Sequence, residues 1–316
     1  MKEIVKDYIR LLHVPTLLLV AFFQLAMFYF VITPFLRSYG VEPVIHTLDV
    51  VNLVLASVFI AAGGFVINDY FDLRIDQINR PITRVVGRTL DKHTAMTLYI
   101  VLTVIGVGFS IMLCWHARSF NYAMVMLFMA GILWFYSSSY KRMLVLGNVI
   151  VALLMALVPM MVALFSNRFM ELEYNISPDL DFLTSRCYTM MGGFALLAFM
   201  WTFLIEVVKD MATVAGDREL ECHSFPVVWG MNATKWILYV WVTLMWVGIG
   251  VLIYFYPVLQ VSSTLRFYVC GMVIPCFSLY YIIAKAQNVG DYRLISKYTL
   301  VLFAISIAYS FTLSFD

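Results

Sequence analysis

Acidic and amide side chains cluster between residues 68 and 76, directly after a long apolar run, in the sequence NDYFDLRID. At about 100° per residue on an α-helix, Asn68, Asp72 and Asp76 drift only about 40° per step and form one oxygen-lined stripe, with Asp69 beside it. Close carboxylates repel one another unless a cation joins them, and carboxylate and amide oxygens suit magnesium. The segment predicts a magnesium site. The alternative is a polar helix end at the lipid headgroups, which would favour basic residues and would not need every acid on one face.

A second acidic segment, KDMATVAGD, covers residues 209–217. Asp210 and Asp217 are seven residues apart, about 20° out of register on a helix, so they share a face. Two such acidic faces opposite each other could hold a pair of magnesium ions with a diphosphate between them.

Basic side chains follow the first acidic segment in NRPITRVVGR, which places Arg80, Arg84 and Arg88 at spacings of four. Lys141 follows Tyr136 in YSSSYKR. Arginine forks match phosphate oxygens, although basic loops also serve simply to orient a membrane protein. We expect the diphosphate to be bound by Asn68, Arg80, Arg84, Arg88, Tyr136, Lys141 and Lys209.

Together these parts predict chemistry on a diphosphate. A clamp of basic residues and magnesium neutralises the negative charge that develops on a departing diphosphate. If the leaving group is allylic, the carbon fragment becomes a carbocation that a nucleophile can capture. Aromatic residues, 16% of the chain, could line an interior that holds an isoprenoid tail.

The elements that position these residues must be membrane helices. The chain of 316 residues is 63% hydrophobic and 13% charged, with a mean hydropathy of +0.89, and such a composition builds no water-soluble surface. A spanning helix needs roughly 20 apolar residues. We therefore predict an all-α, multi-pass helix bundle with nine spans near 14–34, 47–67, 94–114, 120–137, 145–165, 187–208, 234–254, 266–284 and 296–314.

The distribution of basic residues orients this bundle. With the N-terminus in the cytoplasm, 16 Lys and Arg residues fall in inside segments and 5 in outside segments, as the positive-inside rule requires. Both acidic segments then lie at cytoplasmic span ends. We expect an interfacial helix in the first ten residues, an outside loop at 166–186, and location in the cell membrane. The net charge of +2 gives no indication of nucleic-acid binding.

The motifs resemble those of the UbiA prenyltransferase superfamily. Asn68-Asp69-x-x-Asp72-x-x-x-Asp76, followed by Asn79-Arg80-Pro81, is similar to its first motif. The segment from Lys209-Asp210 through Gly216-Asp217 to Ser224-Phe-Pro226 is similar to its second, and YSSSYKRMLVLGN to a further family segment.

This resemblance, which covers almost the whole chain, implies one prenyltransferase domain over residues 1–316, with two magnesium ions and a prenyl diphosphate at the cytoplasmic side. It implies that Asp72, Asp76, Asp210 and Asp217 are catalytic residues that bind the metal ions. The metal ligands also include Asn68, which matches a metal and diphosphate position, and the adjoining Asp69. Arg88 and Lys141 match basic positions near the diphosphate.

The second motif departs from the family pattern at three positions. Thr213 replaces a further acid, Ile205 replaces an arginine, and Glu221 replaces a glycine. The missing carboxylate puts the second metal's ligand set in doubt and leaves open a protein that binds the diphosphate without catalysis.

The KD…GD…SxP form is most similar to the digeranylgeranylglyceryl phosphate synthase-like branch, in which the acceptor is a glycerol-phosphate ether alcohol. Aromatic acceptors of quinone biosynthesis, 4-hydroxybenzoate or dihydroxynaphthoate, remain alternatives. A transporter of another class also remains, although its acids would be expected in mid-helix. His13, His93 and His223 stand singly, and none is singled out as a general base. The five cysteines contain no CxxC pair and predict neither a disulfide framework nor a zinc site.

Overall fold

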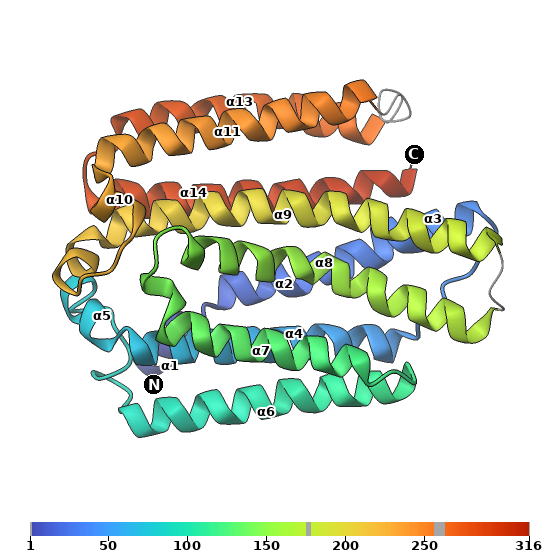
Figure 1. Ribbon diagram of the computed structural model, residues 1–316, viewed down its shortest axis with the longest axis horizontal. Helices are drawn as coiled ribbons and strands as arrows, with labels where there is room; N and C mark the ends of the chain where they lie inside the picture. The colour runs from blue at the N-terminus through green and yellow to red at the C-terminus, as the bar shows by residue number, and fades with distance from the viewer. Residues whose placement is uncertain (1, 175–177, 256–262, 316) are drawn as a thin grey trace.

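A computed structural model describes residues 2–174, 178–255 and 263–315. These residues form helices and no β-strand, and the long helices run side by side along the long axis of the molecule (Figure 1). The helices are α1 (Lys2–Leu11), α2 (Val14–Ala26), α3 (Thr33–Ser38), α4 (Thr47–Phe71), α5 (Leu73–Asn79), α6 (Lys92–His116), α7 (Asn121–Ser138), α8 (Leu146–Glu173), α9 (Pro178–Glu219), α10 (Phe225–Val228), α11 (Gly230–Phe255), α13 (Ser263–Lys285) and α14 (Val289–Ala308). A π-helical segment, Met27–Ile32, joins α2 to α3.

Local sequence explains where several helices begin. Asp91 caps α6, because its side chain accepts hydrogen bonds from the backbone N–H groups of His93 and Thr94 at 3.0 and 3.2 Å. Asn288 and Asp291 form a reciprocal capping box at the start of α14. These caps satisfy backbone donors that would otherwise be left without partners at the helix ends.

The predicted all-helical membrane bundle is confirmed. Within residues 2–174, 178–255 and 263–315, eight helical segments are long and apolar enough to cross a membrane. The predicted span at 266–284 falls on α13, whose stretch Val269–Lys285 is a shorter apolar helix, so the count of nine stays a prediction.

The expected outside loop at 166–186 is wrong for most of its length. Helix α8 continues to Glu173 and α9 begins at Pro178. Helix α9 also continues well past the predicted span end at residue 208, to Glu219. Hydropathy marks only the apolar part of a helix, whereas the backbone hydrogen bonds continue into its polar ends.

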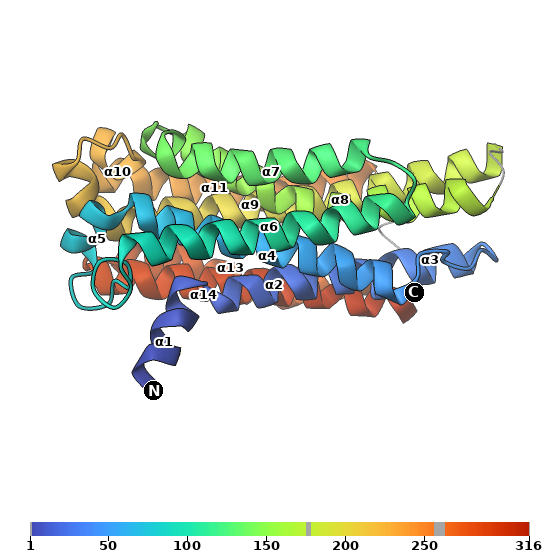
Figure 2. The same ribbon diagram turned by 90° about the horizontal axis from the view of Figure 1, so that it is seen from below.

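The helix ends that carry the acidic segments gather at one end of the bundle, together with α5, α10 and the connections that carry the basic residues (Figures 1 and 2). Helix α1 projects sideways from the bundle near this end (Figure 2), and its location at the membrane interface stays a prediction. The ring of Phe23 in α2 meets that of Phe303 in α14 edge to face at 5.8 Å, which joins the first and last long helices through the core. The bundle thus brings segments far apart in sequence to a common end.

Candidate functional site

The two acidic segments line one cavity at the end of the bundle that carries α5. Ten residues from four separate parts of the chain surround it: Asp72, Ile75, Asp76, Arg80, Lys141, Asp210, Thr213, Asp217, Cys222 and Ser224. Asp72, Asp76 and Asp217 are buried. Burying carboxylates is unfavourable unless cations or hydrogen-bond donors compensate. The partners of each carboxylate therefore indicate what the site can bind.

The chain bends where α4 ends and α5 begins, at Asp72. Backbone hydrogen bonds nevertheless continue through the bend, because the Asp72 N–H donates to the Asn68 carbonyl at 2.9 Å and the Asp76 N–H to the Asp72 carbonyl at 2.8 Å. The structure thereby keeps the acidic stripe on one side of the chain. Asp72 and Asp76 face the cavity, and Asp69 is buried beside them in α4.

Lys141 joins the first acidic segment to the connection after α7. Its Nζ donates to Asn68 Oδ1 at 3.2 Å and forms an ion pair with Asp72 Oδ2. Asn68 Nδ2 donates to the same Asp72 carboxylate at 2.9 Å. Burial lowers the pKa of Lys141, but the charges of Asp72 and Asp76 outweigh it and raise the pKa above its ordinary value. Lys141 therefore carries a positive charge into the cavity.

Asp76 pairs with Arg80, whose Nε lies 3.7 Å from Asp76 Oδ1. Burial raises the pKa of Asp76 above its ordinary value, and Arg80 opposes this shift. The cavity thus presents Arg80 and Lys141 next to two carboxylates of the first segment.

The second acidic segment lies on the polar end of α9. Asp210 accepts a hydrogen bond from Asn148 Nδ2 at 2.8 Å. Asp217 Oδ2 accepts from Ser224 Oγ at 3.0 Å and from Thr213 Oγ1 at 3.3 Å. Neutral donors orient both carboxyl groups in the cavity and bring no positive charge to them.

The other predicted binding residues have different surroundings. Tyr136 is partly buried and acted on by the charges of Asp72, Asp210 and Asp217. Lys209 pairs with Glu206, 2.6 Å away, on a partly exposed part of α9. Arg88 pairs with Asp7 of α1 at 3.2 Å, and Arg84 lies near Asp76. Among the described residues that line the cavity, Arg80 and Lys141 supply the positive charge. Arg84, Arg88 and Lys209 do not line this cavity.

Three asparagine and serine residues at the site were not assigned a role from the sequence. Asn148 and Ser224 hold the two α9 carboxylates, and Asn79 connects α5 to α9. All three lie inside the segments that carry the family resemblance, and this position was the sequence feature that could have indicated a role at the site. Their partners could not be found from spacing, because each contact joins separate parts of the chain.

His13 lies near the same positive charges. Its ring stacks on Phe65 of α4, with ring centroids 4.6 Å apart. Burial, aided by the charges of Lys209, Arg80 and Lys141, lowers the pKa of His13 to about 3. The imidazole is therefore neutral at physiological pH.

The carboxylates fit a divalent ion that completes its coordination with another molecule. No group of three or more His, Cys, Asp or Glu side chains among the described residues could hold a metal by itself. Magnesium, however, is commonly bound through one or two carboxylates plus phosphate oxygens. Asp72 with Asp76, and Asp210 with Asp217, offer two carboxylates each. The donor set suits magnesium together with a phosphorylated ligand.

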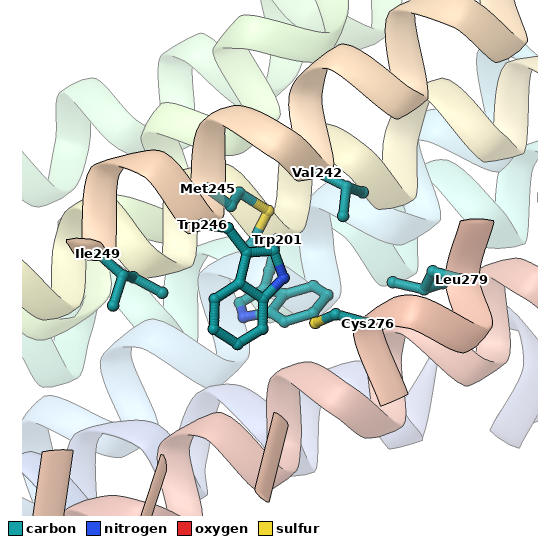
Figure 3. A pocket seen from close by; sticks show the side chains of 7 residues that line it. All are labelled: Trp201, Val242, Met245, Trp246, Ile249, Cys276 and Leu279. Carbon is teal, nitrogen blue, oxygen red and sulfur yellow. The ribbon is translucent and has the colours of Figure 1, made fainter. Parts of the chain in front are cut away.

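A second cavity lies between α9, α11 and α13 and has a different character. Its lining is apolar and aromatic, with Trp201 and Trp246 facing Cys276 across it (Figure 3). The remaining lining residues are Val242, Met245, Ile249 and Leu279. It offers an apolar surface and no carboxylate.

Solved structures share this fold. A structure described as a digeranylgeranylglyceryl phosphate synthase in membranes matches with a TM-score of 0.60 and 19% sequence identity, covering 99% of both chains. A UbiA homolog from Archaeoglobus fulgidus, bound to GPP and Mg²⁺, matches with a TM-score of 0.61 and 14% identity, covering 98% of this chain and 100% of the homolog. At these identities the likeness establishes the fold.

Sequence comparison gives the family. A digeranylgeranylglyceryl phosphate synthase from Thermococcus gammatolerans is 27% identical over 177 residues, 56% of this chain. The match covers 55% of that relative's length. The family model described as "UbiA prenyltransferase family" matches residues 25–307, most of the sequence. The chain belongs to the UbiA prenyltransferase family.

Proposed function

We propose that this protein transfers a prenyl group from an allylic prenyl diphosphate to the hydroxyl of a lipophilic glyceryl phosphate ether, with magnesium. One observation carries the proposal. Carboxylates from two segments more than 130 residues apart, together with Arg80 and Lys141, line a single cavity. Acids and cations in one cavity suit a metal-bound diphosphate, whereas acids alone would suit only the metal.

Asp72 and Asp76 would hold one magnesium ion, and Asp210 and Asp217 a second, with the diphosphate between them. The A. fulgidus homolog of the same fold, bound to GPP and Mg²⁺, supports magnesium. When bound, magnesium neutralises negative charge on the departing diphosphate. Asn68 and Lys141 both contact Asp72 Oδ2 and so orient this carboxylate.

Arg80 and Lys141 bind the diphosphate oxygens in this proposal and stabilise the charge that develops there. The bond between the allylic carbon and the diphosphate oxygen breaks, and its electron pair leaves with the diphosphate. A lone pair of the acceptor oxygen forms the new carbon–oxygen bond, and the hydroxyl proton is released. The products are an ether, diphosphate and a proton.

The glyceryl ether acceptor is supported by the digeranylgeranylglyceryl phosphate synthases among the relatives. We further propose one domain over residues 1–316 in the cell membrane, with the N-terminus and the cavity toward the cytoplasm. The excess of Lys and Arg at that end of the bundle supports this orientation.

The test is a transfer assay with the purified protein in detergent. Labelled geranylgeranyl or farnesyl diphosphate is offered with geranylgeranylglyceryl phosphate, 4-hydroxybenzoate or dihydroxynaphthoate, with and without EDTA. A prenylated glyceryl ether that forms only with magnesium supports the proposal. A prenylated aromatic product alone would replace the acceptor and keep the reaction class. Absence of magnesium-dependent diphosphate binding would overturn the reaction class.

A further inference from the structure

Arg84 differs from Arg80, Arg88 and Lys141, because two of its guanidinium nitrogens have no hydrogen-bond partner among the described residues. Arg80 pairs with Asp76, Arg88 with Asp7 and Lys141 with Asp72. By contrast, Arg84 Nε and Nη1 are shielded from solvent, and no hydrogen-bond acceptor among the described residues reaches them. Buried guanidinium donors without partners are costly, and binding sites commonly leave such donors for the ligand.

The segment that carries Arg84 is held firmly on both sides. The Arg84 N–H donates to the Arg80 carbonyl at 3.0 Å, and Arg80 is fixed on Asp76. Val85 and Val86 follow immediately and are buried in a hydrophobic cluster with Leu11 of α1.

Beyond the valines, a tight turn and a second contact with α1 complete the support. Gly87 has φ +78°, a backbone conformation that favours glycine. Thr89 Oγ1 then donates to Asp7 Oδ2 at 2.6 Å. Because the backbone that carries the Arg84 guanidinium is constrained in this way, little backbone conformational entropy is lost when it binds a ligand.

The position of Arg84 separates it from the diphosphate cavity. Arg80 lines the cavity, and Arg84 is not among its described lining residues, although its charge acts on Asp76. The Arg84 N–H donates to the Arg80 carbonyl in the turn that follows α5, so the two residues are close along the backbone. A phosphate monoester near the reacting hydroxyl of the acceptor would likewise lie beside the donor's diphosphate. Arginine binds such a group through paired N–H donors.

We propose that Arg84 binds the phosphate monoester of the acceptor, beside the diphosphate site and separate from it. This inference rests on the proposed function, because it assigns the acceptor's phosphate to a particular residue. It predicts that the protein distinguishes a phosphorylated glyceryl ether from the same ether alcohol without phosphate, and that Arg84 provides the distinction.

The experiment measures binding and transfer with the full-length protein in detergent. Three ligands are used: the prenyl diphosphate with magnesium, the phosphorylated glyceryl ether, and its dephosphorylated alcohol. The variants are Arg84→Gln and Arg84→Lys. Arg74→Gln is the matched control, because Arg74 is exposed on α5 and its loss removes the same charge from the same end of the bundle.

Arg84→Gln is expected to lower the affinity for the phosphorylated ether about tenfold or more, which is the effect expected from losing a charge-assisted hydrogen bond. Affinity for the diphosphate and for the dephosphorylated alcohol should change less than about twofold, and Arg84→Lys should restore part of the loss. Thermal unfolding checks that the variants fold. No large loss of thermal stability is expected, because Arg84 Nε and Nη1 have no hydrogen-bond partner in the described part of the chain.

Three results would overturn the inference. If Arg84→Gln lost affinity for the prenyl diphosphate as strongly as for the phosphorylated ether, Arg84 would be a ligand of the diphosphate. If its affinity for the phosphorylated ether were unchanged, Arg84 would have no role in binding that ether. A wild-type protein that binds both ethers equally would also contradict it. Failure of the proposed function is distinguishable: the wild type would then bind the phosphorylated ether through Arg84 yet transfer no prenyl group to it.

Discussion

The Gly216 backbone N–H donates to Asn79 Oδ1 at 3.1 Å, across 137 residues of sequence. The Asn79 Nδ2 group donates in turn to the Thr213 carbonyl at 3.0 Å. Asn79 therefore forms hydrogen bonds with two backbone groups of α9, both within the second acidic segment. The Arg293 Nη2 group binds the Asn79 carbonyl at 2.8 Å, which adds α14 to the same contact. This contact fixes the first acidic segment against the second.

Gly216→Ala is expected to disrupt this contact. A Cβ at residue 216 would lie 2.5 Å from Asn79 Nδ2, so the side chain or the helix must move. We expect the free energy of unfolding to fall by about 1–3 kcal/mol, the usual cost of overpacking. Transfer activity should fall about tenfold or more, because the two carboxylate pairs lose their spacing.

Gly193→Ala is the matched control, since it lies in the same helix and a Cβ there meets nothing within 4 Å. Activity and thermal stability are measured for both variants. Equal effects of the two substitutions would show that Asn79 does not set the spacing between the acidic segments.

Much of the site could be predicted from the sequence, because helical periodicity determines which residues share a face. Asp72 and Asp76 line one cavity with Asp210 and Asp217, whereas their roles as metal ligands stay a prediction. The limits of α9 were underestimated, because its polar end carries no hydropathy signal.

The ion-pair and hydrogen-bond partners of individual arginines could not be predicted from the sequence. Arg80, Arg84 and Arg88 recur at the same spacing, yet one pairs with Asp76, one with Asp7 of α1, and Arg84 has buried donors without partners. These differences arise from how the segment after α5 packs on α1, which spacing along one segment does not encode.

Thr213→Asp is expected to create a metal site that does not require a phosphorylated ligand. Thr213 lines the cavity between Asp210 and Asp217 and donates to the latter. A carboxylate there would give three acids on one face, and more carboxylates raise affinity for divalent ions. Manganese or magnesium binding without diphosphate should tighten about tenfold or more relative to wild type. Thr213→Asn is the control of similar size without charge, and equal binding by both variants would contradict this account.

His13→Phe is expected to make the protein less sensitive to acid. An unfolded histidine takes up a proton as the pH falls through about 6.5, whereas folded His13 stays neutral until the pH approaches about 3. Between these values the unfolded state binds more protons, so His13 lowers the free energy of unfolding as the pH falls. Phenylalanine preserves stacking on Phe65 and removes the proton site.

The measurement is the melting temperature from pH 7 to pH 4 for wild type, His13→Phe and His93→Gln, in which an exposed histidine is replaced. The decrease in melting temperature on acidification should be smaller in His13→Phe than in the other two proteins. Equal decreases in all three would show that His13 is not held neutral by its surroundings.

The central claim is that both acidic segments act on one diphosphate. The direct test is magnesium-dependent binding of a labelled prenyl diphosphate to wild type, Asp72→Asn, Asp210→Asn and the control Asp181→Asn, an exposed acid at the far end of α9. Each asparagine keeps the side-chain shape and removes one carboxylate charge. The account predicts that Asp72→Asn and Asp210→Asn each lose magnesium-dependent binding by about a hundredfold, while Asp181→Asn binds as wild type does. Full binding by Asp210→Asn, with loss only in Asp72→Asn, would contradict a shared site.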